Sequence, residues 1–403
     1  MPKLLIIGAA LNSGAPGRIA EQIGILAISK GWEVYHAHGL RYVNPTKLNE
    51  ITVSTKAEEY VHAFMAKFLD LHGLGSKLAT EKLVEKIKEI QPDIIHLHNL
   101  HGYFLNFEVL FNYLKTIDIP VVWTMHDCWP FTGRCFHFVG VHCYKWKTGC
   151  YNCKSEVGYT VSGFCDKSKQ LYQLKKRIFP QVKNMTMVPV SEWLGKFLKD
   201  SYLSKYPVKV IHNGVDIEKF KPIDGTRLRD RHSLQGKNVL LGVAAPWNKR
   251  KGLDDFVKLR GMLSDNIVII LVGLKPEQIE KLPKGIIGIE RTENQRELAE
   301  YYSMADVFVN LTYLDTFPTV NLEALACGTP VLTYETGGSP EAIDDKTGIV
   351  VNQGDIADVA RKICVLQDKR LKSKDCRKRV VKLFNKDKCF EEYINLYNSL
   401  LYR

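Results

Sequence analysis

The sequence predicts an α/β protein of two domains, each built around a parallel sheet, and three observations support this fold class. Short apolar runs of strand length alternate with longer segments whose apolar residues recur at helical spacing. This alternation pauses at a polar stretch and then begins again. The chain has 403 residues, which suits two domains better than one. Repeated strand–helix–strand order is typical of parallel sheets with crossover helices.

The first half of the chain shows this order from its beginning. Residues 3–8 form an apolar run that predicts a buried first strand. Residues 18–30 have apolar side chains at helical spacing, and Gly31 is suited to end that helix. Further strands are predicted at residues 33–37, 93–98, 120–125 and 187–190, and further helices at residues 78–90 and 191–199.

The second half repeats the pattern after a polar stretch at residues 219–237, which contains Pro222 and Gly225 and is the predicted linker. Strands are predicted at residues 238–244, 266–272, 285–289, 307–310 and 330–334, and helices at residues 296–303 and 319–327. We expect a first domain at residues 1–205 and a second domain at residues 206–380. A last helix at residues 381–403 is expected to return to the first domain.

Composition narrows the class of protein. Hydrophobic residues make up 45% of the chain and charged residues 25%, which are ordinary globular values. No apolar run reaches the roughly 18–20 residues that span a bilayer, and the opening is too short for a signal peptide. We therefore expect a cytoplasmic protein. The net charge of +12, concentrated in residues 1–205, favours an anionic partner such as the inner membrane face.

The segment from Asp315 to Val331 carries the strongest chemical signal. Asp315 is followed by a short loop and then by the start of the helix predicted at residues 319–327. Unpaired amides at a helix N-terminus attract a diphosphate, so the amides of Thr319, Val320 and Asn321 are predicted to bind one. Glu323 lies one turn into the helix, where its carboxylate can accept two hydrogen bonds from a ribose diol.

This segment resembles the E-x7-E signature of glycosyltransferase family 4, with Asp315 in place of the first Glu. Residues 212–222 and 336–341 resemble two further motifs of that family, in the same order along the chain. The resemblance implies a GT-B fold, in which two Rossmann-like domains face a central cleft. It also implies that the enzyme retains the anomeric configuration of a sugar taken from a nucleotide diphosphate. The implied donor-binding residues include Asn213, Phe317 and Pro318, and Asp315 would hold the sugar.

A cationic turn follows the first strand of the second half. Lys249, Arg250, Lys251 and Gly252 stand at a strand-to-helix turn, where cations suit a pyrophosphate. Lys251 matches the lysine of the family's phosphate-binding pair. The expected arginine falls at Ala245 or Pro246, so this sequence departs from the pattern, and Arg250 is the predicted substitute.

The first half offers Gly14 and Arg18 as further donor-binding candidates, and His126 is a predicted catalytic residue together with Asp315 and Lys251. Gly14 and Arg18 lie in a glycine-bearing loop that opens a helix, and the family implies that this loop faces the transferred sugar. The loop is not G-x-G-x-x-G, which argues against a dinucleotide enzyme. His126 ends a predicted strand, where the family carries a histidine that contacts the donor sugar. His96 and His98 share one face of another strand, and we expect packing or acceptor contact there.

Four cysteines form a separate pattern in a predicted insertion at about residues 128–165. Cys135, Cys143, Cys150 and Cys153 close with a C-x-x-C, which suits structural tetrahedral zinc. Free thiols and disulfides are the alternatives. No open histidine–carboxylate set is evident, and the resemblance implies no catalytic metal.

The sequence therefore predicts a glycosyltransferase acting on a glycan or lipid-linked glycan in capsule, exopolysaccharide or lipopolysaccharide synthesis. The first half offers no convincing carboxylate nucleophile; Asp127 is closest, but it follows His126 and could only orient it. Same-face attack is therefore favoured, with diphosphate as the proton acceptor. The alternatives are another GT-B enzyme, such as an epimerase or phosphorylase, and a zinc-bearing nucleic-acid-binding protein. We expect no nucleic-acid partner.

Overall fold

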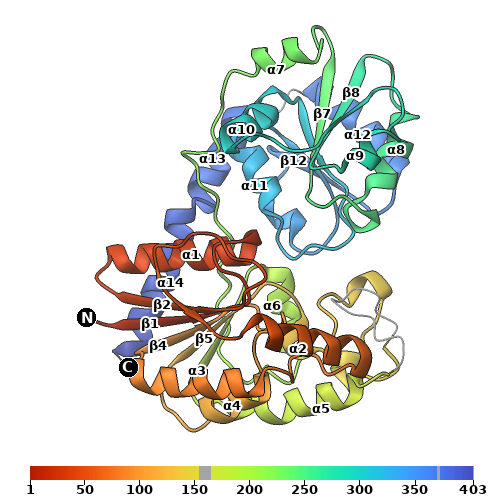
Figure 1. Ribbon diagram of the computed structural model, residues 1–403. Helices are drawn as coiled ribbons and strands as arrows, with labels where there is room; N and C mark the ends of the chain where they lie inside the picture. Colours follow the sequence, from red (N-terminus) through yellow and green to blue (C-terminus); the bar gives the residue numbers. More distant parts are fainter. Residues whose placement is uncertain (154–164, 370–372, 403) are drawn as a thin grey trace. The chain divides into compact units, whose positions relative to one another are not determined.

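The computed structural model describes residues 1–153, 165–369 and 373–402, and the chain forms two compact units (Figure 1). Unit 1 comprises Met1–Ile211 together with Phe390–Arg403, and unit 2 comprises His212–Cys389. Within the described ranges, no helix has the length and the apolar composition needed to cross a bilayer.

Unit 1 is built on a six-stranded sheet in the order β3-β2-β1-β4-β5-β6, and every neighbouring pair is parallel. Strands β1, β4, β5 and β6 are almost fully buried, because helices cover both faces of a parallel sheet. The strands are β1 Lys3–Ile7, β2 Glu33–His38, β3 Asn49–Thr52, β4 Ile94–Leu97, β5 Val121–Met125 and β6 Met185–Pro189.

Helix α1 lies on one side of this sheet, and α3, α4 and α5 lie along the other (Figure 1). An aromatic cluster that includes Phe107, Phe111 and Trp123 fills the space between sheet and helices. The helices of unit 1 are α1 Gly14–Ser29, α2 Lys56–Leu69, α3 Lys77–Ile90, α4 Phe107–Leu114, α5 Ser168–Ile178 and α6 Glu192–Lys199, with short 3-10 turns η1 Trp129–Phe131, η2 Val139–Val141, η3 Lys145–Lys147 and η4 Phe179–Gln181.

Unit 2 repeats the architecture with a second six-stranded parallel sheet in the order β12-β11-β10-β7-β8-β9. Counted from its own first strand, each sheet runs 3-2-1-4-5-6, which is the doubly wound order. The predicted fold class is therefore confirmed. The strands are β7 Asn238–Val243, β8 Ile267–Val272, β9 Ile286–Ile289, β10 Val307–Asn310, β11 Val331–Tyr334 and β12 Gly348–Val351.

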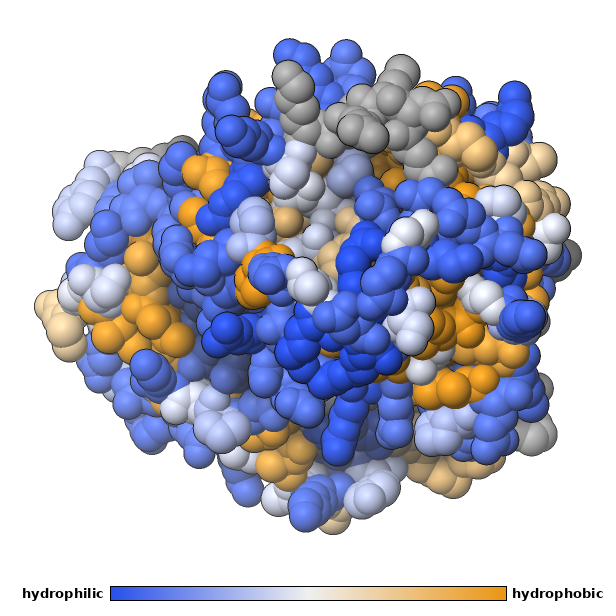
Figure 2. Space-filling model, turned by 90° about the horizontal axis from the view of Figure 1, so that it is seen from above, coloured by the Kyte–Doolittle hydropathy of each residue, from blue (hydrophilic) through white to orange (hydrophobic). Residues whose placement is uncertain are grey.

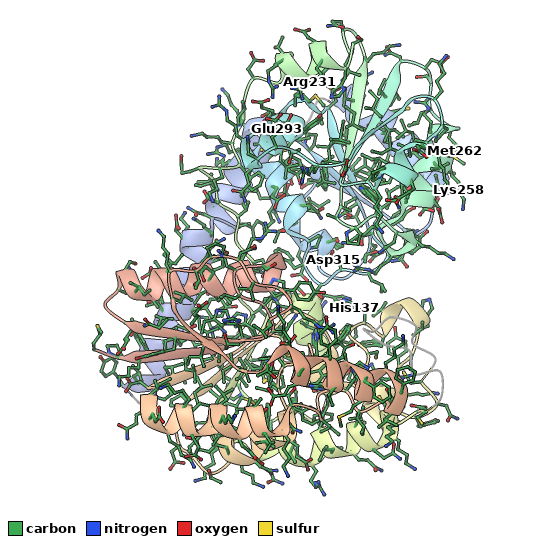
Figure 3. All side chains as sticks on the ribbon, viewed as in Figure 1. His137, Arg231, Lys258, Met262, Glu293 and Asp315 are labelled. Carbon is green, nitrogen blue, oxygen red and sulfur yellow. The ribbon has the colours of Figure 1, made fainter. Side chains whose placement is uncertain are left out.

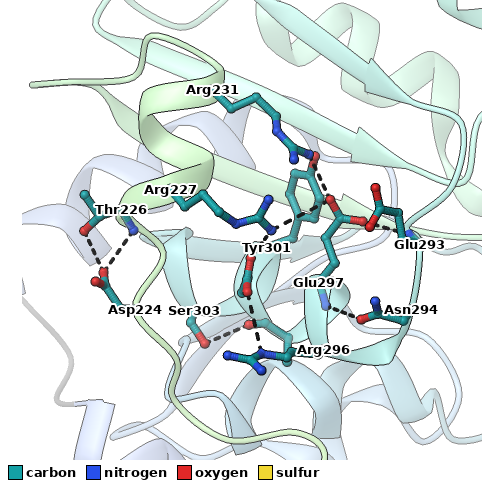
Figure 4. Close-up of polar contacts among 12 residues, drawn as sticks. Asp224, Thr226, Arg227, Arg231, Glu293, Asn294, Arg296, Glu297, Tyr301 and Ser303 are labelled. Carbon is teal, nitrogen blue, oxygen red and sulfur yellow. Dashed lines mark hydrogen bonds and ion pairs between the residues drawn. The ribbon is translucent and has the colours of Figure 1, made fainter.

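The helices of unit 2 begin inside the stretch that the sequence predicts as a linker. Helix α7 (Thr226–Arg231) packs on α10 (Gln295–Met304) through ion pairs from Arg227 to Glu300 and from Arg231 to Glu297 (Figure 4). These pairs make the stretch part of unit 2. The remaining helices are α8 Leu253–Arg260, α9 Pro276–Ile279, α11 Thr319–Ala326, α12 Ile356–Lys369 and α13 Ser373–Leu383, with turns η5 Lys249–Lys251 and η6 Ser339–Ala342.

The last helix, α14 (Lys386–Leu401), joins unit 1 from Phe390 onward. The Tyr397 hydroxyl lies 2.7 Å from Nδ1 of His96 on β4, and the ring of Tyr397 packs edge-on against Trp32. The Thr124 hydroxyl donates to the Tyr393 hydroxyl at 3.1 Å. The end of the chain therefore completes the interior of the first sheet.

Buried histidines make unit 1 sensitive to acid. Burial lowers the pKa of His36 and of His96 to about 3, so both rings stay neutral in the folded state at neutral pH. In the unfolded chain they titrate near 6.5, so the unfolded state binds more protons below that pH. Between pH 6.5 and 5, each histidine should therefore cost about 2 kcal/mol of the free energy of unfolding.

We expect His36→Leu to reduce this acid sensitivity, because neither ring nitrogen of His36 has a partner among the described residues. Urea unfolding at pH 7 and pH 5 should show a loss that is smaller in the variant by about 2 kcal/mol. An identical loss in the wild type and the variant would contradict this assignment.

Candidate active site

The loop that precedes α11 is the centre of the candidate site in unit 2. It runs from the end of β10 to Thr319, where the helix begins directly after Pro318. Phe317 and Pro318 are buried, whereas Thr319 and Val320 are half-exposed at the first helical positions. The first amides of a helix have no acceptor within it, so this terminus offers donors and a positive dipole to an anion.

Three separate motifs support the main chain of this loop. The Leu314 carbonyl accepts from Nη1 of Arg250 at 3.1 Å, and the Thr316 carbonyl accepts from the Gly338 amide at 2.9 Å. The Phe317 carbonyl accepts from Nδ2 of Asn213 at 3.2 Å. The cationic turn and the motifs at residues 212–222 and 336–341 thus all contact the loop that begins the Asp315–Val331 segment.

His212 adds two further contacts that hold this loop. Its ring lies 4.8 Å from the ring of Phe317, and its Nε2 lies 2.8 Å from Oε2 of Glu341. These contacts fix the loop from the side of residues 212–216 and from η6. Asn213, which the sequence predicts as a donor-binding residue, is buried and acts here as a support for Phe317.

The acid and the lysine of the site form an ion pair. Nζ of Lys251 lies 2.7 Å from Oδ2 of Asp315, and both side chains are about one-fifth exposed. Asn248 caps the turn η5 by accepting from the Lys251 amide. Gly252 follows at a φ of +76°, where a Cβ would lie 2.2 Å from the Leu311 carbonyl oxygen. This close approach sets the cationic turn against the end of β10.

Glu323 is positioned from α10. Its Oε2 accepts a hydrogen bond from the Tyr302 hydroxyl at 2.9 Å. Burial, with the neighbouring Glu323 as the next cause, raises the pKa of Tyr302 well above its usual value, so this tyrosine remains a donor. Asn321, in contrast, turns its side chain inward, where its Oδ1 accepts from Nδ2 of Asn310 at 2.8 Å. The Asn321 amide donates to the Pro318 carbonyl at 3.2 Å, so the predicted contact of Asn321 with the donor is not supported by this geometry.

In unit 1, Gly14 lines a cavity of about 260 Å³ at the carboxyl end of β1, together with Ser13, His98 and His101. Gly14 has a φ of +62°, which favours glycine at the first position of α1. Arg18 is exposed on α1 and does not line this cavity. Of these two predicted donor-binding residues, Gly14 therefore lines the cavity, whereas Arg18 lies one helical turn later and does not.

His126 forms a pair with His98. Nε2 of His126 lies 3.0 Å from Nδ1 of His98, and the two rings stack. Burial lowers the pKa of His126 to about 4, so the ring is neutral at physiological pH. Nε2 of His98 is buried and has no partner among the described residues, and His98 borders the cavity that contains Gly14.

Asp127 contacts a different histidine from the one that the sequence suggests. Its Oδ2 lies 2.7 Å from Nε2 of His101, and its Oδ1 accepts from the Trp129 amide at 2.9 Å. Burial raises the pKa of Asp127, but His101 and the Trp129 amide outweigh burial and lower it overall. The charge of Asp127 acts on His126 by raising its pKa, against the larger effect of burial.

The four cysteines that the sequence predicts as zinc ligands lie together. Cys135, Cys143, Cys150 and Cys153 line one cavity of about 240 Å³, and each of the chain's cysteines carries a thiol. Structural zinc needs sulfurs about 2.3 Å from the ion. Outside residues 154–164, 370–372 and 403, no set of three or more His, Cys, Asp or Glu side chains is placed to hold a metal. The structure therefore does not support the predicted zinc.

The structure adds Tyr302, which the sequence analysis does not assign to the site and which lies behind Glu323. It also places His98, which the sequence offers for packing or acceptor contact, beside His126. These contacts join residues that are 21 and 28 positions apart, so no local motif indicates them.

Gly337 provides a test of the loop's packing. Its φ is +55°, and a Cβ would lie 1.7 Å from the Asp315 carbonyl oxygen. We expect Gly337→Ala to lower the free energy of unfolding by about 2 kcal/mol or more, because it combines backbone strain with a main-chain clash. The measurement is thermal and urea unfolding.

Gly261→Ala is the matched control, because Gly261 has a helical φ and its Cβ would make an ordinary contact at 3.4 Å. Equal stability of the two variants would contradict the described packing of Asp315 on Gly337.

Comparison with known proteins places the two halves in one enzyme class. Residues 51–219 match the family model described as Glycosyltransferase Family 4, and residues 237–369 match the model described as Glycosyl transferases group 1. The putative colanic acid biosynthesis glycosyl transferase WcaC of Escherichia coli is 25% identical over 324 residues, which cover 77% of each chain. D-inositol 3-phosphate glycosyltransferase of Streptomyces bingchenggensis is 34% identical over 39% of each chain.

Solved structures agree in fold. Sucrose-phosphate synthase from Thermosynechococcus elongatus superposes with a TM-score of 0.72 at 19% identity, over 99% of both chains. Anabaena HepE in complex with UDP-glucose gives a TM-score of 0.68 at 14% identity, over 99% of this chain and 100% of that one. These matches favour the predicted enzyme over a nucleic-acid-binding protein. The chain is a glycosyltransferase of the GT-B fold, with a Glycosyltransferase Family 4 domain in its first half and a Glycosyl transferases group 1 domain in its second.

Proposed function

We propose that this enzyme transfers a sugar from a nucleotide-diphosphate donor to a glycan or lipid-linked glycan, with retention of the anomeric configuration. The pathway would build capsule, exopolysaccharide or lipopolysaccharide. The observation that carries the donor assignment is the anion-binding terminus of α11 beside the Lys251–Asp315 pair. Relatives named for colanic acid and capsular polysaccharide synthesis support the pathway, and HepE was solved with UDP-glucose.

Each part of the donor has a matching group in unit 2. Glu323, held by Tyr302, would accept hydrogen bonds from the ribose diol. The amides of Thr319 and Val320 and the Lys251 ammonium would bind the diphosphate. Asp315 would hold sugar hydroxyls. Arg250 would act mainly through the loop, because its guanidinium donates to the Leu314 carbonyl.

The transfer would use same-face attack. As the bond from the sugar to the leaving diphosphate breaks, the acceptor oxygen bonds to the anomeric carbon on the same face. The acceptor's proton passes to a diphosphate oxygen, and Lys251 stabilises the developing charge. A two-step route needs an available carboxylate nucleophile. Asp127 suits that role poorly, because its oxygens already contact His101 and the Trp129 amide.

His126 would hold the transferred sugar as a neutral hydrogen-bonding group. Its lowered pKa keeps the ring uncharged, and the contact of its Nε2 with Nδ1 of His98 helps to fix the orientation of the ring. The cavity beside Gly14 and His98 would receive the acceptor, while Arg18 stands outside it. The basic character of residues 1–205 supports peripheral contact with an anionic membrane.

The donor assignment can be tested by thermal-shift titration with UDP, GDP, ADP and CMP. One diphosphate should raise the melting temperature of the wild type by mass action. Glu323→Ala and Lys251→Ala should each weaken its binding at least about tenfold, because each removes a charged hydrogen-bonding partner. Lys258→Ala, on an exposed position of α8, is the control and should bind normally.

Retention is tested separately by NMR of the product formed from an isotopically labelled donor and an extract of lipid-linked glycans. The anomeric configuration should equal that of the donor. Inversion, or a donor changed without transfer, would overturn the proposal.

Tyr302→Phe tests how Glu323 is positioned. The variant loses one hydrogen bond to the carboxylate and should bind the ribonucleotide about tenfold more weakly. Binding of the 2′,3′-dideoxy analogue should not change, because that analogue has no ribose diol. Tyr301→Phe is the matched control, since the Tyr301 hydroxyl contacts His232 instead. Equal weakening of both nucleotides in Tyr302→Phe would indicate a merely structural tyrosine.

A further inference from the structure

Helix α2 of unit 1 exposes large apolar side chains and buries polar ones, which is the opposite of a normal surface helix. Most exposed apolar side chains of this protein are scattered, and the face drawn in Figure 2 is mostly hydrophilic with separate apolar patches. On α2, however, Tyr60, Val61 and Phe64 are 70%, 60% and 57% exposed, while Glu59, His62 and Ala66 are buried. The apolar residues point outward and the polar residues point inward.

Polar contacts hold the inner face of α2 in place. Oε1 of Glu59 accepts from the Leu40 amide at 2.6 Å and from the Ser54 hydroxyl at 3.0 Å. His62 contacts the Ser76 hydroxyl at 3.0 Å. Asp70, directly after the helix, pairs with Arg134 at 2.8 Å. The helix therefore gains little from burying its own apolar residues, and its orientation is fixed by its polar side.

The outer face of α2, which we define as Tyr60, Val61, Phe64 and Phe68, forms a continuous stripe. These positions are spaced as one side of a helix, and the rings of Phe64 and Phe68 lie 4.6 Å apart. Lys67 lies over the Phe68 ring, and Lys56 begins the helix. These two lysines are the exposed charged side chains of α2, since Glu58 is only half-exposed and is engaged in the capping box.

We infer that the outer face of α2 is a docking surface for an anionic lipid bilayer. Aromatic and aliphatic side chains on one face, with lysines beside them, are the composition of helices that lie in the membrane interface. The positive charge complements acidic headgroups. A second copy of this chain fits less well, because pairing two such faces would bring like-charged lysines together. This inference rests on the proposed peripheral contact with an anionic membrane and assigns the surface that makes it, but it does not depend on the proposed sugar transfer.

The test is co-sedimentation of the full chain with vesicles of phosphatidylcholine alone and of phosphatidylcholine with phosphatidylglycerol. The wild type should bind the anionic vesicles, and Tyr60→Ser/Phe64→Ser should bind them about tenfold less, because two apolar side chains leave the interface. Lys67→Glu should lower binding to the anionic vesicles at least about fivefold and leave binding to neutral vesicles unchanged.

Matched controls come from α8 and the residues after it in unit 2. Val257 and Met262 are 39% and 56% exposed, and Lys258 lies beside them (Figure 3). Val257→Ser/Met262→Ser and Lys258→Glu should bind vesicles as the wild type does. Nucleotide-induced thermal shifts report whether each variant is folded, so failure of docking is distinguishable from failure of donor binding.

Two results would overturn the inference. One is the absence of the expected difference in co-sedimentation: the wild type binds neither kind of vesicle, or the Tyr60→Ser/Phe64→Ser variant binds them as the wild type does. The other is a wild-type dimer in sedimentation velocity that becomes monomeric in that variant, which would make a second copy the occupant.

Discussion

The support of three loop carbonyls determines the geometry of the donor-side site. Arg250, Gly338 and Asn213 donate to the carbonyls of Leu314, Thr316 and Phe317, and they come from three separate segments of unit 2. Because a peptide group is planar, fixing these carbonyls fixes the orientation of three peptide planes directly before α11 begins at Thr319. The position of Asp315, its pairing with Lys251 and the start of α11 all follow from this arrangement.

Close main-chain packing explains why glycines occur at the edges of this site. Gly337 allows the Asp315 carbonyl to approach, and Gly252 allows the Leu311 carbonyl to approach. A side chain at either position would push the acid or the cationic turn away from the other. The Lys251–Asp315 distance of 2.7 Å thus depends on residues that never touch a ligand. Preorganised charges of this kind avoid the cost of rearrangement when a diphosphate binds.

Much of the fold could be predicted from the sequence, because buried parallel strands are continuous apolar runs bounded by turns. The edge strands β3 and β12 were not predicted, since β3 is polar and mostly exposed and β12 is half-exposed. Helix α2 was also not predicted, because its apolar stripe faces outward. Within the site, Asp315, Lys251 and Glu323 could be placed from the motifs that contain them. The His98–His126 and Tyr302–Glu323 contacts could not, because they depend on how β4 lies beside β5 and α10 beside α11.

The two units share one strand order but differ in the electrostatics of their carboxyl edges. Unit 2 presents Lys251, Arg250 and a helix terminus, which suit a diphosphate. Unit 1 presents histidines, and burial lowers the pKa of His98 and of His126, so both rings are neutral. A sugar hydroxyl needs hydrogen-bonding partners rather than charge, and neutral imidazole rings supply such partners. One shared strand order thus carries two different sets of side chains, so the chemistry of each edge is determined by its residues and not by the fold.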